Sequence, residues 1–123
     1  MDTHRVGRRF EATAERHLVG EGWEVVDRNV RFHRKEIDLV IRRGRTVAFV
    51  EVKGRRGPSC GHPLEAITSR KRREIELVAR WWVEAHGVAG DEFRFDAVSV
   101  TLDEDGRDRV MHVPDAWRPQ GSR

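Results

Sequence analysis

The sequence predicts a single α/β domain in which helices cover both faces of a central sheet. Two segments have the apolar spacing of amphipathic helices: residues 5–20, and a second helix that begins at residue 64 or 68 and ends at 86. Two strands predicted in the middle of the chain are apolar on both faces, which requires a helix layer on each side of the sheet. The 123 residues support one core, which we assign to residues 1–117, followed by a tail at 118–123.

The first half of the chain predicts one helix followed by three strands. Apolar side chains of the first helix recur every four positions, at Val6, Phe10, Ala14 and Leu18. Residues 23–32, 36–41 and 46–52 are rich in β-branched and aromatic residues, which is typical of strands. The Arg-Gly pair at 43–44 predicts a tight hairpin between the second and third strands.

The second half of the chain predicts a loop, a helix and two strands. Residues 54–63 contain three Gly and two Pro, which is the composition of a loop. The second helix carries its apolar residues on one face and stops before Gly87; they are Ile75, Val78, Ala79, Trp82 and Ala85. Residues 93–102 alternate like a strand, residues 109–113 form a short last strand, and the chain from Pro114 onward is expected to be a tail.

The charged residues are unevenly distributed along the chain. The net charge is only +3, yet residues 28–73 contain fourteen Lys or Arg against four acids, a net of +10. Residues 91–115 contain three basic residues against eight acids, a net of −5. A basic segment of this density is typical of a protein that binds a polyanion, because cations placed on phosphates release condensed counterions. The alternative is the solvated surface of an arginine-rich protein.

Composition excludes several other classes of protein. Cys60 is the only cysteine, which excludes a disulfide framework, and Cys60 with His62 has no second pair of zinc ligands at suitable spacing. No segment approaches the roughly 18 apolar residues of a membrane span, and residues 1–10 lack the apolar region of a signal peptide. We therefore expect a cytoplasmic protein without a membrane partner.

Three of the four acids in the basic segment lie on the two most apolar strands. Side chains alternate along a strand, and a hairpin loop of even length pairs Asp38 with Phe49 and Glu36 with Glu51. Glu36, Asp38 and Glu51 would then converge on one patch together with Lys53. A loop of odd length without a bulge would place Asp38 and Glu51 on opposite faces of the sheet.

Carboxylates packed across a ladder repel one another, so this patch needs a compensating charge. Mg²⁺ or Mn²⁺ provides one, because Mg²⁺ prefers oxygen ligands and is commonly held by one or two carboxylates with water and substrate phosphate. Lys53 lies two residues beyond Glu51 on the same face, where it could orient or deprotonate water or stabilise developing charge. The alternative is a surface ladder of ion pairs, which the apolar neighbours of these residues disfavour.

Asp38, followed thirteen positions later by Glu51-Val52-Lys53, resembles the signature of restriction-endonuclease-like nucleases. Further segments extend the likeness: residues 7–18 (GRRFEATAERHL), 28–29 (RN), 36–39 (EIDL), 49–53 (FVEVK), 63–67 (PLEAI), Lys71 with its neighbours, and 94–98 (RFDAV). In that order they resemble the YraN-like family of uncharacterised bacterial proteins, which is related in fold to archaeal Holliday junction resolvases. The resemblance covers roughly residues 5–113.

The resemblance implies a restriction-endonuclease-like αβββαβ core with a mixed central sheet flanked by helices. It assigns the metal site and the catalytic role to Glu11 of the first helix with Asp38 and Glu51, adds Lys53 as a catalytic residue, and makes Glu36 auxiliary. The sequence also departs from the family pattern, which usually has Gly before the acids at 11 and 36 and Thr after Lys53. Phe10, Lys35 and Gly54 stand at these positions.

Together these features predict a Mg²⁺- or Mn²⁺-dependent endonuclease that acts on DNA and includes branched or structured DNA among its substrates. Phosphate contacts are expected from cations in the loop after Lys53 and at the start of the second helix: Arg55, Arg56, Arg70, Lys71, Arg72 and Arg73. The alternatives are a non-catalytic nucleic-acid-binding or adaptor module, and an RNA substrate, which would leave the carboxylates unexplained. A homodimer is expected only by analogy with small nucleases that cut two strands.

Trp81 and Trp82 project about 100° apart on the second helix, so both cannot face one core. Trp82 belongs to the apolar face. Trp81, with Leu77, is expected to form a second wall of the core, with a partner surface or a base-stacking platform as the alternative.

Overall fold

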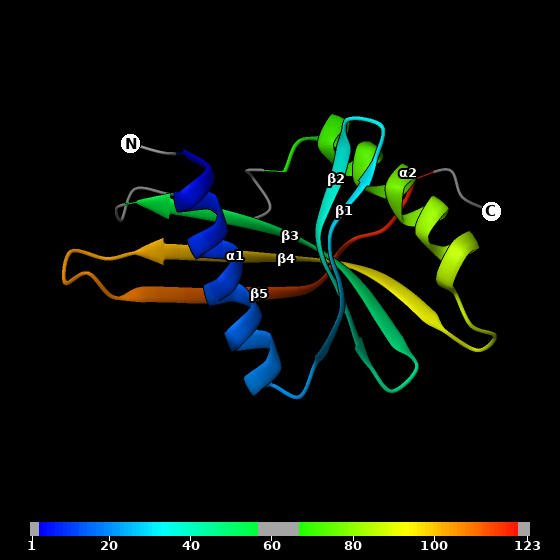
Figure 1. The fold of residues 1–123 in the computed structure, drawn as a ribbon, viewed down its shortest axis with the longest axis horizontal. Coiled ribbons are helices and arrows are strands. Elements are labelled where there is room, and N and C mark those ends of the chain that lie inside the picture. Colours follow the sequence, from blue (N-terminus) through cyan, green and yellow to red (C-terminus); the bar gives the residue numbers. More distant parts are fainter. Residues whose placement is uncertain (1–2, 57–66, 121–123) are drawn as a thin grey trace.

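The computed structural model describes residues 3–56 and 67–120, which form a five-stranded sheet and two helices (Figure 1). The elements are α1 (Thr3–Gly20), β1 (Glu24–Phe32), β2 (Lys35–Arg43), β3 (Thr46–Arg56), α2 (Ser69–His86), β4 (Glu92–Leu102) and β5 (Asp108–Trp117). The strands lie in the order β1-β2-β3-β4-β5, and only β3 and β4 are parallel. The mixed α/β sheet and the αβββαβ core expected from the sequence are confirmed, and the expected short last strand is present as the longer β5 at the edge.

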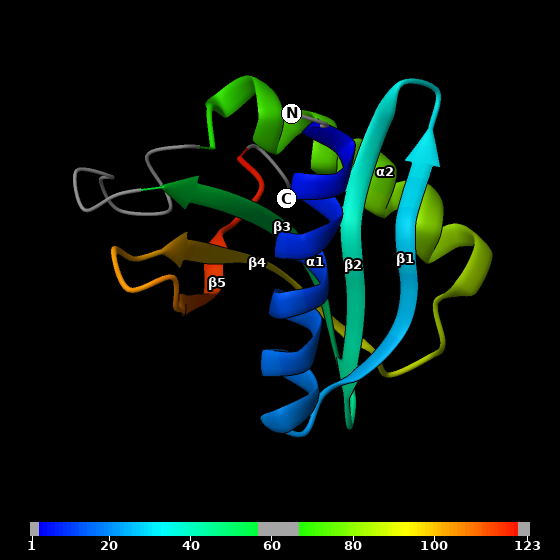
Figure 2. The same ribbon diagram turned by 60° about the vertical axis from the view of Figure 1, so that its left-hand side comes forward.

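The two helices lie on opposite faces of the sheet, as Figure 2 shows for α1 and α2 on either side of the β1–β2 hairpin. Ala14 and Leu18 of α1 are buried against β2, β3 and β4, while Val78 and Trp82 of α2 are buried against the other face. Burying a side chain such as Leu18 contributes roughly 1.5–3 kcal/mol. Among the described residues, neither helix contains an apolar run long enough to cross a membrane.

The hairpin between β2 and β3 has a two-residue loop, so the expectation of an even-length loop is confirmed. Arg43 pairs with Thr46, and Gly44 has a φ of 62°, which is typical of the first loop position of a type II′ turn. The tight loop shifts the register by two residues from the predicted one. The expected pairs of Asp38 with Phe49 and of Glu36 with Glu51 are therefore wrong, since Val40 faces Phe49.

The alternation of side chains changes phase in the outer half of the β1–β2 hairpin. Ile37 and Val40 both pack in the core under α2, whereas Leu39 packs in the core under α1. Strict alternation along β2 predicts one face for Glu36, Asp38 and Val40, and this is wrong for Val40. The described β2–β3 pairing also ends at Leu39 and Val50, and from there the hairpin continues without β3 (Figure 1).

β3 continues beyond Gly54, so the predicted loop at 54–63 is wrong for residues 54–56. Gly54 pairs with Val100 and Arg56 with Leu102 in the parallel ladder to β4. This pairing overrides the weak strand preference of glycine. The rest of the predicted loop, residues 57–63, lies outside the described residues.

β5 continues past Pro114, so the tail expected from that residue is wrong up to Trp117. Asp115 has a φ of 49° in a bulge opposite β4, and Trp117 is buried with its ring stacked on Phe95 at 5.2 Å. A proline is tolerated here because β5 is an edge strand. The strand-like sequence pattern ends at the bulge, whereas the strand itself continues to Trp117.

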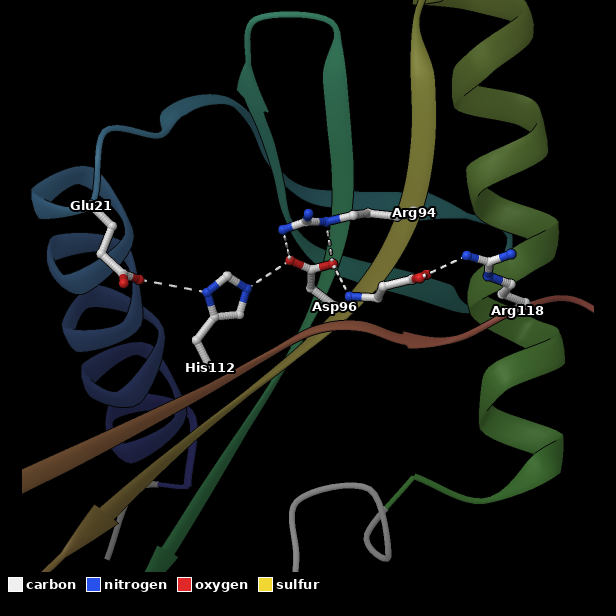
Figure 3. Close-up of polar contacts among 6 residues, drawn as sticks. Glu21, Arg94, Asp96, His112 and Arg118 are labelled. Carbon is white, nitrogen blue, oxygen red and sulfur yellow. Dashed lines mark hydrogen bonds and ion pairs between the residues drawn. The ribbon is translucent and has the colours of Figure 1, made fainter.

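A buried polar network ties this bulge to the rest of the fold (Figure 3). The fully buried Asp96 of β4 accepts hydrogen bonds from both nitrogens of the Arg94 fork at 3.0 Å and from the Asp115 N–H at 3.0 Å. His112 Nε2 lies 2.6 Å from Asp96 Oδ2, and its Nδ1 lies 3.5 Å from Glu21 at the end of α1. Burial alone would raise the pKa of Asp96, but these hydrogen bonds hold it below its usual value.

Candidate metal centre

A cleft of about 780 Å³ opens at the place where β2 and β3 separate, beside the first half of α1. Its walls come from α1, the β1–β2 hairpin and the second half of β3. Four acids line it together with two arginines and an asparagine: Glu11, Glu36, Asp38, Glu51, Arg8, Arg31 and Asn29. The separation of the strands leaves backbone groups and carboxylates facing the cleft, where a continuous sheet would have paired or covered them.

Three carboxylates meet in this cleft. Glu11, Glu36 and Asp38, all half-buried, each offer one carboxylate oxygen, and these oxygens lie within 4.8 Å of one another. All three donors are carboxylate oxygens. Hard oxygen donors suit Mg²⁺ and Mn²⁺, and three anions this close together favour a divalent cation. The residues present therefore fit the expected ion.

Asn29 orients two members of this group. Its side-chain amide donates to Glu11 Oε1 at 3.0 Å and to Glu36 Oε1 at 2.9 Å. Asn29 has a φ of 49°, a left-handed conformation that asparagine adopts more readily than most residues, and it lies opposite Asp38 between the pairs Arg28–Leu39 and Val30–Ile37. The sequence predicts no role for Asn29, although the ease with which asparagine adopts a left-handed backbone is a signal that could have identified it.

Asp38 is held at the point where the strands part. Its Oδ2 accepts a hydrogen bond of 2.7 Å from the Val52 N–H, which lies just beyond the last described β2–β3 pair. Burial, followed by the charge of Glu51, raises the pKa of Asp38 to about 8, against the opposing effect of the Val52 hydrogen bond. Burial beside other carboxylates therefore disfavours the charged form of Asp38.

Glu51 lies in the same cleft but outside the group of three. Its side chain is only 6% exposed, its Oε1 lies 3.8 Å from Lys53 Nζ, and its Oε2 is buried with no hydrogen-bond partner among the described residues. Burial raises the pKa of Glu51, while the charges of Lys71 and Lys53 oppose the rise. The predicted set of Glu11, Asp38 and Glu51 is thus brought into one cleft, with Glu36 closer to the first two than Glu51.

The cations expected to contact phosphate have different surroundings. Lys71 is close enough to lower the pKa of Glu51, and Arg70 forms an exposed ion pair of 3.5 Å with Glu74. Arg73 is exposed, whereas Arg72 donates to the Ile67 carbonyl at 3.1 Å and lies over the Trp117 ring at 5.6 Å.

The other two cations lie at the end of β3, beside the cleft. Arg55 is half-buried, and Arg56 is the last residue of β3, with a side chain outside the described part of the chain. The predicted basic group is therefore spread over two elements that adjoin the carboxylates.

Comparison with known proteins agrees with the sequence resemblance. The profile of the uncharacterised protein family UPF0102 matches residues 10–100. UPF0102 proteins of Chlorobium limicola, Rhodococcus jostii and Clavibacter michiganensis are 37%, 39% and 40% identical to this chain. The alignments cover 98%, 91% and 90% of this chain and 98%, 95% and 94% of the relatives, in the same order.

Among solved structures, SfsA of Pyrococcus furiosus in complex with Ca²⁺ has a TM-score of 0.35 and 16% sequence identity. The match covers 92% of this chain, and the chain spans 64% of the SfsA chain. A match at this level adds no argument about the site. Both the profile match and the identity to these relatives show that the chain belongs to UPF0102, the YraN-like family.

Proposed function

We propose that the cleft is the active centre of a divalent-metal-dependent nuclease that hydrolyses phosphodiester bonds in DNA, with branched or structured DNA among its substrates. The observation that supports this most directly is the convergence of Glu11, Glu36 and Asp38 within 4.8 Å, with Glu36 and Asp38 belonging to the net basic segment 28–73. Structural ion-pair networks also gather carboxylates, and Glu36 does pair with Arg31 at 3.7 Å. Glu11, however, accepts a hydrogen bond from the neutral Asn29 amide, and Asp38 accepts one from the Val52 N–H.

Glu11, Glu36 and Asp38 would hold Mg²⁺ or Mn²⁺, and Glu51 would join them directly or through water. The bound ion would polarise the phosphate and lower the pKa of a water nucleophile. Lys53, beside Glu51, would orient that water or stabilise the charge that develops on the phosphate. Asn29 would keep Glu11 and Glu36 turned toward the centre.

The cations of α2 and of the end of β3 would dock the phosphate backbone and contribute affinity without base specificity. We place this activity in the cytoplasm, where a lone cysteine remains reduced. A dimer that presents two clefts would allow both strands to be cut.

The test is cleavage of linear, flapped and four-way DNA with Mg²⁺ or Mn²⁺. We expect Asp38→Asn and Glu11→Gln to lower the rate by about 100-fold or more, since loss of groups around a metal costs about 10- to 100-fold even beyond the direct ligands. Glu15→Gln is the matched control, because Glu15 lies one turn along α1 and pairs with Arg28 at 2.7 Å, away from the centre. It should cut DNA like the wild type.

Mn²⁺ binding measured by calorimetry provides a second readout. The wild type and Glu15→Gln should bind the ion, and Asp38→Asn should bind it far more weakly. If Mn²⁺ binding is unaffected by the substitutions and no substrate is cut, the nuclease proposal fails. Retained nucleic-acid binding would then identify a non-catalytic binding module, and cleavage of RNA alone would correct the substrate.

A further inference from the structure

Aromatic and apolar side chains gather where the tip of the β1–β2 hairpin meets α2; His33, Leu77 and Trp81 are exposed, and Phe32 is half-buried against the core. We call Phe32, His33, Leu77 and Trp81 the stacking surface. Leu77 and Trp81 are each 40% exposed, so the expectation that Trp81 forms a second wall of the core is wrong. The Trp81 ring instead stacks on Phe32 at 5.7 Å with an interplanar angle of 26°.

The hairpin turn adds a third ring to this pair. His33 has a φ of 59°, and its ring meets the edge of Phe32 at 4.5 Å with an interplanar angle of 67°. Phe32 pairs with Lys35, so the turn itself is only His33 and Arg34. A short turn of this kind holds the two hairpin rings in fixed positions beside Trp81.

Cations lie around the stacking surface, together with the acids Glu74, which pairs with Arg70 at 3.5 Å, and Glu84. Arg34 and Lys35 follow the hairpin rings in sequence, and Arg34 is exposed. On α2, Arg73 lies one turn before Leu77 on the same face and Arg80 one turn after it, both exposed, while Glu84 is the exposed acid one turn beyond Trp81. Exposed aromatic rings among cations fit single-stranded nucleic acid, whose bases stack on rings and whose phosphates attract the cations.

The stacking surface directly adjoins the cleft. Arg31 and Glu36 line the cleft and pair with each other across the hairpin, and the next pair is Phe32 with Lys35. The hairpin stands between α1 and α2 (Figure 2), with the carboxylates on the α1 side and Phe32 on the α2 side. A DNA strand that contacts both the stacking surface and the carboxylates must bend around the hairpin tip. A duplex is too stiff for such a bend, since its persistence length is about 50 nm, whereas a single strand follows it.

We propose that the stacking surface binds unpaired bases of a single-stranded segment that adjoins the phosphodiester bond in the cleft. This inference rests on the proposed nuclease function and specifies its substrate: DNA in which a duplex meets a single strand. Bases stacked on Trp81 and Phe32 would hold the single strand on one side of the hairpin, while the neighbouring phosphate reaches the carboxylates on the other.

The inference is tested by binding without cleavage, using the full chain with EDTA. Trp81 is the only exposed tryptophan, because Trp23, Trp82 and Trp117 are each at most 7% exposed. A short oligothymidylate should therefore quench the intrinsic fluorescence, and a blunt duplex of equal length should quench it much less. Trp81→Leu should remove the quenching and weaken oligothymidylate binding about tenfold, as expected from one lost base–aromatic stack.

Two controls separate stacking from general effects. Phe93→Leu removes another aromatic side chain that is 40% exposed, on β4, and should leave oligothymidylate affinity unchanged. Leu77→Gln keeps all rings and should weaken binding less than Trp81→Leu. Duplex affinity should be the same within about twofold in all three variants, since it depends on phosphate contacts.

The outcomes distinguish this inference from the function on which it rests. Cleavage of plain duplex with no effect of Trp81→Leu on single-strand binding overturns the inference and leaves the nuclease in place. Trp81-dependent binding without cleavage of any substrate supports the stacking surface and overturns the nuclease. A shift from dimer to monomer in Trp81→Leu with unchanged binding would make this surface an interface between two copies and overturn the inference.

Discussion

The Phe10 ring lies so close to Gly54 that a Cβ at position 54 would be 1.8 Å from Cδ2 of the ring. Both residues line the cleft, and both depart from the YraN-like pattern, in which glycine usually precedes the acid of α1 and threonine follows the lysine of β3. The two departures compensate each other, because the large side chain on α1 fills the space that the missing side chain on β3 leaves free. With Phe10 in this position, only glycine fits at position 54 without a shift of the ring.

This relationship predicts a strong coupling in stability. Gly54→Thr should lower the free energy of unfolding by about 1–3 kcal/mol or more through overpacking, and Phe10→Ala should lower it by about 3 kcal/mol through the cavity it leaves. The double variant should be more stable than the sum of the two losses implies, with a coupling of at least about 1 kcal/mol. Urea unfolding of all four proteins measures it, and additive losses would contradict the compensation.

The raised pKa of Asp38 predicts a pH-dependent stability in metal-free protein. Between the ordinary value of 3.8 and about 8, the folded protein retains a proton that the unfolded chain has released. This stabilisation is complete below the unfolded value and is lost as the pH rises through the folded value. The melting temperature in EDTA should therefore fall from about pH 5 to about pH 8.

Asp38→Asn is the control for this effect, because the amide oxygen can still accept the Val52 hydrogen bond and does not ionise. Its melting temperature should fall less over the same pH range and exceed that of the wild type at the alkaline end. Added Mn²⁺ should raise the melting temperature of the wild type at the alkaline end of this range and leave that of Asp38→Asn unchanged. Parallel pH profiles of the two proteins would contradict the raised pKa of Asp38.

The Asp96 network predicts an opposite, acid-sensitive contribution. Asp96→Asn should cost about 3 kcal/mol, because it leaves Arg94 without its buried carboxylate. Since the folded pKa of Asp96 is lowered, its contribution is present above 3.8 and is lost as the pH falls through the folded value. Acid unfolding followed by circular dichroism should be steeper in the wild type than in Asp96→Asn, and the exposed Asp105→Asn should match the wild type.

Substitutions of Arg72 and Arg73 should distinguish a role in folding stability from a role in DNA binding. Arg73→Gln should reduce the salt dependence of duplex affinity by about 0.9 in the log-log slope if Arg73 contacts one phosphate. Arg72→Gln should lower stability by about 1 kcal/mol through the lost hydrogen bond to Ile67, with little change in the slope. Salt titrations and urea unfolding of both variants check this, and equal slopes for the two would contradict the assignment.

The regular parts of the fold could be predicted because local periodicity determines them. The apolar spacing of α1 and α2 and the two-sided apolar pattern of β2 and β3 depend only on neighbours in sequence. The strand ends could not be predicted where pairing overrides composition: Gly54 remains in β3 because β4 pairs with it, and Pro114 lies within β5 because Asp96 holds the adjoining bulge. The hairpin register depended on a turn whose length the sequence left open.

The candidate site could be predicted in part for the same reason. Strand alternation predicted that Glu36, Asp38 and Glu51 lie in one region, and all three line the cleft. The left-handed Asn29, which donates to Glu11 and Glu36, was not predicted, because the backbone of the neighbouring strand is not encoded by the alternation of β2. Glu11 came from the family resemblance, because spacing along α1 cannot reveal which strand its edge approaches.

The two outer strands have a consequence for how molecules of this protein meet one another. β1 is interrupted by a bulge near Val26 and by the left-handed Asn29, and β5 by Pro114 and the left-handed Asp115. A strand from another molecule can align with only short stretches of either edge, because regular hydrogen bonding fails at each interruption. The sheet therefore ends at five strands, and crowded copies of the protein are protected against edge-to-edge aggregation.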